Sequence, residues 1–254
     1  MMYKTLLRPL LFQCSPEAAH SVFHSFLKVL FSLPLSDVLT EAMFRICDKR
    51  LIVRIAGIDF PNPVGLAAGF DKNATLFNWL SHFGFGSIEV GTVTPRPQPG
   101  NPLPRLFRLP DDKALINRMG FNNDGAHVIA KRLEKRKTKI VIGANIGKNR
   151  DTPIENAADD YLICFHVLFD LADYFVLNVS SPNTPGLREL QQKDHLKKLL
   201  EIVSGENQKH QNPKPVFLKI SPDLNDEELT GIISTATAFG MAGIVATNTT
   251  TNRQ

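Results

Sequence analysis

The chain has 254 residues, of which 43% are hydrophobic and 21% charged, and its formal net charge is +4. This length suits one large barrel domain, and no apolar run approaches the ~20 residues of a membrane-spanning helix. One charge block, Lys131–Lys137, is most simply the solvated end of a surface helix, with a nucleic-acid patch as the minor alternative, and no nucleic-acid partner is expected. Three cysteines without metal-ligand spacing, Cys14, Cys47 and Cys164, indicate a reducing compartment and predict neither disulfides nor a metal site.

The first predicted element is a helix that begins at Ser15-Pro16-Glu17, with Ser15 as N-cap and Pro16 at the first helical position. Apolar residues then recur at helical spacing on one face: Ala19, Val22, Phe23, Phe26, Leu27 and Leu30. A signal peptide is not expected, because Glu17 and His20 interrupt the apolar region. Two interpretations stay open: helices packed on the rest of the protein, or an interfacial segment that dips into a membrane.

Six short apolar runs follow, and each of them ends in polar residues. They are Pro63–Ala68, Ser87–Val90, Ile140–Ala144, Tyr174–Val179, Val216–Leu218 and Gly243–Ala246. Because they lack strict alternation, these runs indicate strands of a parallel sheet that is buried on both faces. Helices are predicted between them, at Ala74–His82, Gly125–Arg136, Glu155–Leu171, His195–Val203 and Asp226–Phe239, the last with Asn225 or Asp226 as N-cap.

The polar residues at the strand ends distinguish two kinds of α/β fold. A doubly wound sheet places its ligand at one switch point, whereas a (β/α)8 TIM-type barrel gathers groups from all its strands in one central site. Amide, amine or hydroxyl groups follow all six runs, which favours the barrel. No G-x-G-x-x-G loop follows a strand, which argues against a nicotinamide Rossmann site.

Closure of the barrel requires two more strand–helix units of ~30 residues each, and the sequence stops at Gln254, in the loop after the sixth strand. We therefore expect an N-terminal helical extension over residues 1–48 and a barrel over residues 49–254 that is incomplete at its C-terminus.

Six motifs in this order resemble the dihydroorotate dehydrogenases of the membrane-associated, quinone-using class. They are Ala67–Lys72, Gly91–Asn101, Asn117–Asn123, Asn145–Asn149, the segment around Ser181, and Thr247–Thr250. The resemblance covers the chain from about Ser15 onward. It implies an FMN enzyme of pyrimidine synthesis that oxidises dihydroorotate to orotate and passes electrons to a quinone. It also implies peripheral membrane association at the cytoplasmic face.

The resemblance assigns the catalytic base to Ser181, where the cytosolic class has cysteine. A serine hydroxyl is a weak base and needs a polarised neighbourhood, for which Ser180, Asn183 and Thr184 are candidates. Matching substrate positions are Lys72, Asn117, Arg118, Met119, Gly120, Phe121, Asn178, Asn183, Asn248 and Thr249. Asparagine offers a donor and an acceptor, which suits a pyrimidine with alternating C=O and N–H groups.

Flavin positions implied by the resemblance are Ala68, Gly69, Phe70, Asp71, Lys72, Thr92, Asn145, Asn178, Lys219 and Thr247. Lys219 carries a cation that would stabilise reduced, anionic flavin. The quinone-site candidates are His20 and Arg108, although the segment Arg105–Arg108 also fits a surface loop.

One departure from the family concerns the Gly-rich loops after strands seven and eight, which hold the flavin phosphate in relatives. Without them, residues 1–254 alone are expected to be largely insoluble or flavin-free. Two alternatives to the enzyme therefore remain: an inactive truncated remnant that acts only as a binding protein, and a related FMN barrel acting on another pyrimidine.

Overall fold

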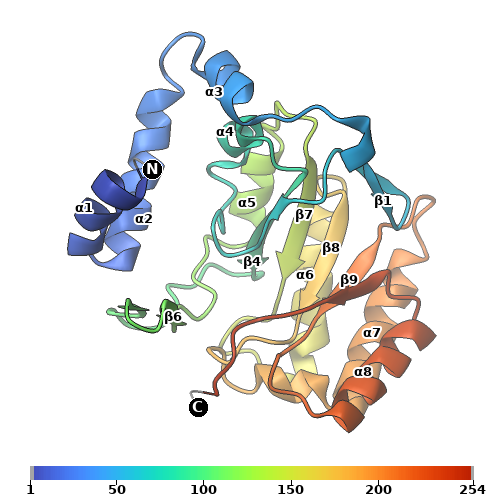
Figure 1. Ribbon diagram of the computed structural model, residues 1–254. Coiled ribbons are helices and arrows are strands. Elements are labelled where there is room, and N and C mark those ends of the chain that lie inside the picture. Colours follow the sequence, from blue (N-terminus) through green and yellow to red (C-terminus); the bar gives the residue numbers. More distant parts are fainter. Residues whose placement is uncertain (1–2, 253–254) are drawn as a thin grey trace.

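Six parallel strands form the central sheet of the protein, which a computed structural model describes over residues 3–252 (Figure 1). Their order across the sheet is β10-β9-β8-β7-β4-β3. The bounds are β3 Gly65–Leu66, β4 Ser87–Val93, β7 Val141–Ile146, β8 Tyr174–Asn178, β9 Val216–Lys219 and β10 Gly243–Val245. All six predicted strands are present. The first is reduced to two residues, because Pro61 and Pro63 just before it have no N–H to donate.

The sheet curls into a half-barrel, as predicted, with β3 and β10 as its outer strands. Its inner strands β7 and β8 are buried along their whole length, and β4 is buried from Ile88 to Val93. This burial explains why these strands are mostly apolar, since both faces of a parallel sheet are covered. Consecutive strands lie side by side and in parallel, so the polar residues after them meet at one end of the half-barrel.

Helices cover the outside of the sheet between the strands (Figure 1). They are α4 Phe77–Leu80, α5 Ala126–Leu133, α6 Ala157–Leu168, α7 Lys193–Asn207 and α8 Asp226–Ala238, with short 3-10 turns at η2 Lys49–Leu51, η3 Ser81–Phe83, η4 Ile154–Asn156 and η5 Leu187–Gln191. The predicted start of α8 is confirmed, because Asn225 and Glu228 form a reciprocal capping box with two 2.9 Å hydrogen bonds. The helix predicted from Ala74 begins only at Phe77, since Ala74 has a left-handed φ of 50° that no α-helix accommodates.

Two antiparallel hairpins were not predicted from the sequence. The first pairs β1 Val53–Ile55 with β2 Ile58–Phe60, and Phe60 packs against the start of β7 and β8. The second pairs β5 Leu106–Leu109 with β6 Ala114–Asn117. The interpretation of Arg105–Arg108 as a surface loop is therefore wrong, since Leu106–Arg108 belong to β5. Each hairpin is short and only partly buried, which gives its strands little apolar signal.

The N-terminal helices lie to one side of the half-barrel (Figure 1): η1 Tyr3–Leu7, α1 Arg8–Gln13, α2 Pro16–Leu30 and α3 Ser36–Phe44. Ser15 is the N-cap of α2, as predicted, and its Oγ accepts a hydrogen bond from Ala18 N at 3.2 Å. The apolar stripe of α2 is only partly buried. Leu27 is fully buried, whereas Val22 is 56% and Phe26 54% exposed. Among the helices of residues 3–252, none combines the length and apolar character that crossing a bilayer requires.

Candidate active site

Three buried polar side chains from neighbouring strands converge at the carboxyl end of the half-barrel. Thr92 of β4 donates from Oγ1 to Asn145 Oδ1 at 2.6 Å. Asn178, the last residue of β8, donates from Nδ2 to Thr92 Oγ1 at 2.8 Å and to Asn145 Oδ1 at 3.1 Å. Each of the three is at most 5% exposed. The predicted gathering of strand-end groups is thus present for β4, β7 and β8.

Glu89 lies beneath this cluster and was not predicted as a site residue. Its Oε1 accepts from Asn145 Nδ2 at 2.8 Å, and its Oε2 lies 3.4 Å from Tyr174 OH. Burial raises the pKa of Glu89, while the nearby charge of Lys219 and the bond from Asn145 lower it. A lone carboxylate inside the apolar run Ser87–Val90 was the signal that could have identified it.

Ser181 lies in the loop after β8 and is 5% exposed. The backbone N–H of Asn183 donates to its Oγ at 3.2 Å, so this predicted neighbour supplies a hydrogen bond to the hydroxyl. Ser180 instead donates to Asn178 Oδ1 at 2.8 Å and accepts from Asn248 Nδ2 at 2.9 Å. Thr184 Oγ1 is buried and has no hydrogen-bond partner among residues 3–252. An unpaired buried hydroxyl beside Ser181 fits a position that a ligand or water completes.

A second group of predicted residues lies opposite the Ser181 loop. Asn183 Nδ2 donates to Asn117 O at 2.9 Å and links the loop to the end of β6. Lys72 donates to Asn122 Oδ1 at 2.5 Å and to Met119 Sδ at 3.3 Å. Burial, with a smaller contribution from the charge of Arg105, lowers the pKa of Lys72 to about 8. Lys72 can therefore change its charge near neutral pH.

In the motif before α4, the backbone is exposed at Gly69, whereas the side chain of Asp71 is hydrogen-bonded within its own turn. Gly69 has a φ of 106°, its N–H donates to Gly91 O at 2.9 Å, and an added Cβ would meet no atom within 4 Å. The carboxylate of Asp71 instead accepts from Thr75 N and Leu76 N, both at 2.8 Å. It caps the turn before α4, so any cofactor contact of Asp71 is left to its backbone. Ala68 is half-buried next to Gly69.

The remaining predicted residues either pack against neighbouring residues or are more exposed than the cluster of Thr92, Asn145 and Asn178. The ring of Phe121 is buried against Gly147 next to Gly120, and Arg118 is exposed, with its guanidinium 6.0 Å from the Phe107 ring centroid. Lys219 is half-buried at the end of β9. Thr247 and Thr249 are exposed, and Thr249 O accepts from Arg188 Nη2 at 3.2 Å.

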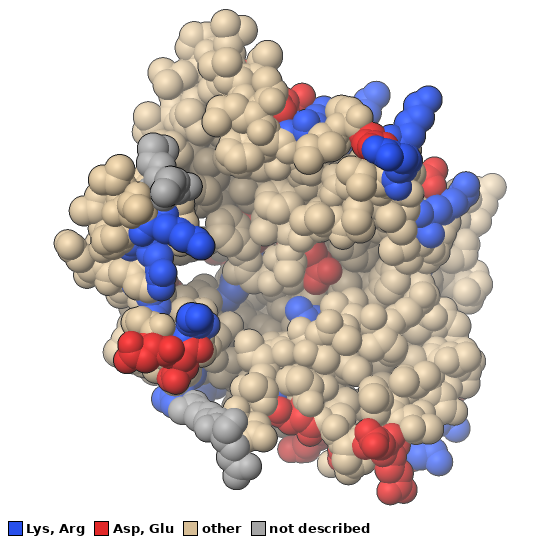
Figure 2. All heavy atoms as spheres, viewed as in Figure 1, with Lys and Arg blue, Asp and Glu red and all other residues tan. Residues whose placement is uncertain are grey.

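The quinone-site candidates join the N-terminal helices to the barrel. His20 Nε2 is hydrogen-bonded to Phe70 O at 3.0 Å, and Arg108 Nη1 donates to Cys14 O at 2.5 Å. Arg105, which was not predicted, forms an ion pair of 2.6 Å with Glu17 of α2 and is largely buried. A cavity of about 600 Å³ lies between the start of α2 and residues 103–106. Figure 2 shows the molecule hollowed between these helices and the barrel.

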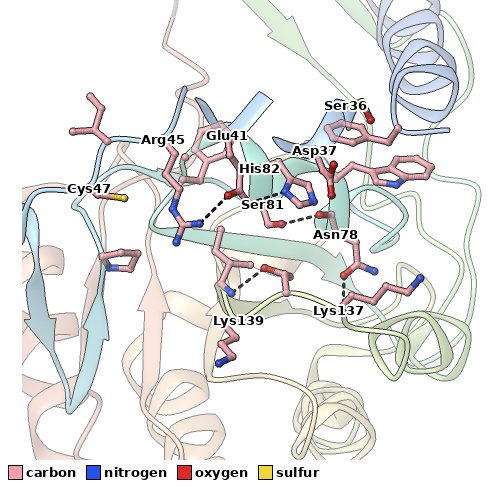
Figure 3. Close-up of a pocket in the computed structure, with 18 of the residues that line it drawn as sticks. Ser36, Asp37, Glu41, Arg45, Cys47, Asn78, Ser81, His82, Lys137 and Lys139 are labelled. Carbon is pink, nitrogen blue, oxygen red and sulfur yellow. Dashed lines mark hydrogen bonds and ion pairs between the residues drawn. The ribbon is translucent and has the colours of Figure 1, made fainter. Parts of the chain in front are cut away.

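A second cavity, of about 1440 Å³ and thus larger than the one at α2, lies elsewhere. It opens between α3 and the segments that precede β3, β4 and β7 (Figure 3). It therefore lies at the amino ends of these strands, whereas Ser181 follows the carboxyl end of β8. Glu41 there accepts from Arg45 at 3.1 Å and pairs with His82 at 2.9 Å. These three side chains thus pair with one another. In barrels of this kind the active site lies at the carboxyl ends of the strands, so this cavity is not the candidate active site.

The half-barrel and its cluster of strand-end amides and hydroxyls define a (β/α)-barrel enzyme with its site at the carboxyl ends of the strands. The family model described as dihydroorotate dehydrogenase matches residues 50–254. The chain belongs to the dihydroorotate dehydrogenase family, as the sequence motifs predicted.

Individual relatives agree with this assignment. The dihydroorotate dehydrogenase (quinone) of Christiangramia forsetii is 52% identical over 253 residues, which span 100% of this chain and 74% of that protein. The enzyme of the same name from Roseiflexus sp. is 49% identical over 98% of this chain and 69% of its own length. The crystal structure of the Eimeria tenella dihydroorotate dehydrogenase in complex with ferulenol has a TM-score of 0.83 and 42% identity, and covers 94% of this chain and 68% of that one.

Proposed function

We propose that this protein oxidises dihydroorotate to orotate in pyrimidine synthesis, with FMN as cofactor and a quinone as electron acceptor. The observation that carries the proposal is a set of asparagines at the carboxyl ends of the strands and in the Ser180–Asn183 loop: Asn145 and Asn178 are buried, and Asn117, Asn183 and Asn248 are half-buried. The family match favours this function over an inactive remnant or an enzyme for another pyrimidine.

The donor set fits a flavin. Thr92, Asn145 and Asn178 offer buried hydrogen-bonding groups, Lys219 offers a cation, and the open space at Gly69 lets a flat ring approach the backbone. When bound, FMN supplies the acceptor for the hydride that leaves one ring carbon. Ser181 Oγ would take the proton from the adjacent carbon while its own hydroxyl proton passes to water, so the side chain is neutral before and after the step. The N–H of Asn183 would stabilise the partial negative charge on that oxygen as its own proton leaves.

A direct test uses the purified full-length protein under anaerobic conditions. It should be yellow from bound FMN and should bleach on addition of dihydroorotate. A colourless full-length protein, or one that carries a nicotinamide nucleotide, would contradict the cofactor assignment. Retained yellow colour after dihydroorotate, with bleaching by a different reduced pyrimidine, would instead support the second alternative.

Lys72 gives orotate binding a predicted pH dependence. We propose that its ammonium group pairs with the substrate carboxylate. Because the pKa of Lys72 is about 8, the group is charged below that pH and loses its proton as pH rises through it. The dissociation constant of orotate should therefore be constant at lower pH and rise towards tenfold per pH unit above about 8. Orotate titrations followed by flavin absorbance between pH 6.5 and 9.5 measure this.

A Lys72→Gln variant is the matched control for that titration. It should bind orotate weakly at every pH and show no break near pH 8, since the titrating group is gone. A wild-type affinity that stays flat across the range would exclude Lys72 as the partner of the carboxylate.

We further propose that residues 1–48 form an extension that attaches the barrel, residues 49–254, to the cytoplasmic face of a membrane. Exposed apolar side chains concentrate in this extension: Tyr3, Leu6, Leu7, Leu10, Phe12, Val22, Phe26, Val29, Leu33, Leu35, Val38, Leu39, Met43, Phe44 and Ile46. So dense an exposed apolar surface is typical of a membrane or protein contact. His20 and Arg108, which join the N-terminal helices to the rest of the protein through hydrogen bonds to Phe70 O and Cys14 O, are the proposed quinone contacts.

A further inference from the structure

A separate group of potential metal ligands lies outside the barrel. His166 is in the last turn of α6, Glu206 is in the last turn of α7, and His210 follows α7 in the connection to β9. One ligand atom from each residue lies within 4.8 Å of the others. Both helices end just before the starts of β8 and β9, so the group lies a full strand length from the Ser181 loop.

The three side chains are held by their surroundings. The ring of His210 stacks on Phe169 with a centroid distance of 3.6 Å and an interplanar angle of 17°. The connection that carries His210 is fastened by Asn207, whose side chain donates to Lys214 O at 2.8 Å and accepts from Lys214 N at 2.9 Å. The position of His210 beside α6 is therefore preorganised.

The polar atoms of the group are available to a cation. Lys209 binds Glu206 Oε2 at 2.6 Å, while Glu206 Oε1 faces His166 Nε2 at 3.6 Å, too far for a hydrogen bond. Within residues 3–252, no hydrogen bond occupies the ring nitrogens of His166 or His210.

Two imidazole nitrogens and one carboxylate oxygen form a common ligand set for zinc. Zinc bonds of about 2.0–2.2 Å place ligand atoms roughly 3.4 Å apart. Side-chain rotations that move each atom by about 1 Å would close the present spacing. His166 is exposed on the helix surface, so its side chain is free to make this movement.

We propose that His166, Glu206 and His210 bind a divalent zinc-like ion that links the end of α6 to the connection between α7 and β9. The site holds the amino-terminal ends of β8 and β9 together, where a barrel gains stability rather than catalysis. The positive charge of Lys209 opposes the cation, so we expect micromolar affinity. The site could not be predicted from the sequence, because the three residues do not match a zinc motif and His166 is far from the other two along the chain.

The test is isothermal titration of the chelator-treated full-length protein with ZnCl₂. Cys14 and Cys47 are exposed and bind zinc themselves, so both are first replaced by serine. This parent should bind one zinc ion per chain. His166→Gln and Glu206→Gln should each weaken binding by roughly tenfold or more, since even loss of an outer contact to a metal ligand costs about 10–100-fold. His127→Gln, at an exposed histidine on α5, is the matched control and should bind like the parent.

Thermal unfolding separates a lost site from a damaged fold. Without metal, His166→Gln should unfold at the same temperature as the parent, because His166 is exposed. Zinc at a hundredfold excess over its dissociation constant should raise the midpoint of the parent by about 5–10 °C and leave that of His166→Gln unchanged. Absence of stoichiometric zinc binding by the parent, or equal binding by the His166→Gln and His127→Gln variants, would overturn the proposal.

Discussion

Replacing Ser181 by alanine is expected to slow the reduction of bound flavin by dihydroorotate ~10²–10⁴-fold, the usual contribution of a positioned general base. The hydroxyl is 5% exposed, and Asn183 N donates to it at 3.2 Å, so it has both a defined position and a polarising neighbour. Orotate affinity should change little, because the proposed ring contacts come from asparagine side chains. Anaerobic stopped-flow absorbance measures the rate, and flavin titration measures the affinity.

The neighbouring serine provides a matched control for this prediction. Ser180 bridges Asn178 and Asn248 and does not contact the Ser181 hydroxyl in any hydrogen bond within residues 3–252. Ser180→Ala should therefore weaken orotate binding more than it slows the proton step. A rate loss below tenfold for Ser181→Ala at neutral pH would mean that Ser181 is not the base.

The inner strands β4, β7 and β8 were predictable because both of their faces are buried. A run such as Tyr174–Asn178 shows its strand character in five consecutive residues, all buried. The hairpins lacked that signal. In β5, Leu106–Leu109 is half-buried throughout, and its partner β6 is half exposed, so neither apolar runs nor clean alternation marked them.

The candidate site was predictable where function depends on position at a strand end, as for Thr92, Asn145 and Asn178. The site was less predictable where a side chain forms hydrogen bonds within its own segment of the chain. Asp71 caps the turn before α4, a role that depends on the left-handed turn at Ala74 and could not be read from the motif. Glu89 was missed for the opposite reason. It lies inside a strand, and only the fold brings Asn145, Tyr174 and Lys219 around it.

The apolar stripe of α2 shows how two interpretations of one pattern can each hold for part of a helix. Phe23, Leu27 and Leu30 pack on the barrel core, whereas Val22, Phe26 and Val29 point away from it and are 54–65% exposed. In Figure 2 the upper left of the molecule, where the N-terminal helices lie, is largely tan and carries few charged residues. Deleting the whole extension would uncover Leu27 and the core beneath it, so a deletion confounds membrane binding with stability.

Replacing only the outward residues avoids this problem. The triple variant Val22→Gln, Phe26→Gln, Val29→Gln keeps good helix formers and leaves Leu27 in place. Each lost apolar contact with lipid is worth about 1 kcal/mol for a half-exposed side chain, so partition into lipid vesicles should fall roughly a hundredfold. Reduction of a long-chain quinone in those vesicles should fall with it. Flavin reduction by dihydroorotate should be unchanged, since the Ser181 loop is untouched.

The matched control also replaces three exposed apolar residues by glutamine, but on barrel helices: Val128→Gln on α5, Ile163→Gln on α6 and Ile233→Gln on α8. These side chains are 43–45% exposed, so the control removes a similar exposed apolar area from a different face. It should partition like the wild type, because these barrel helices lie outside the extension that is proposed to meet the lipid. A short-chain, water-soluble quinone should be reduced equally by both triple variants, since it reaches the site without the membrane. Equal vesicle binding by the two variants would mean that the outward face of α2 serves another contact.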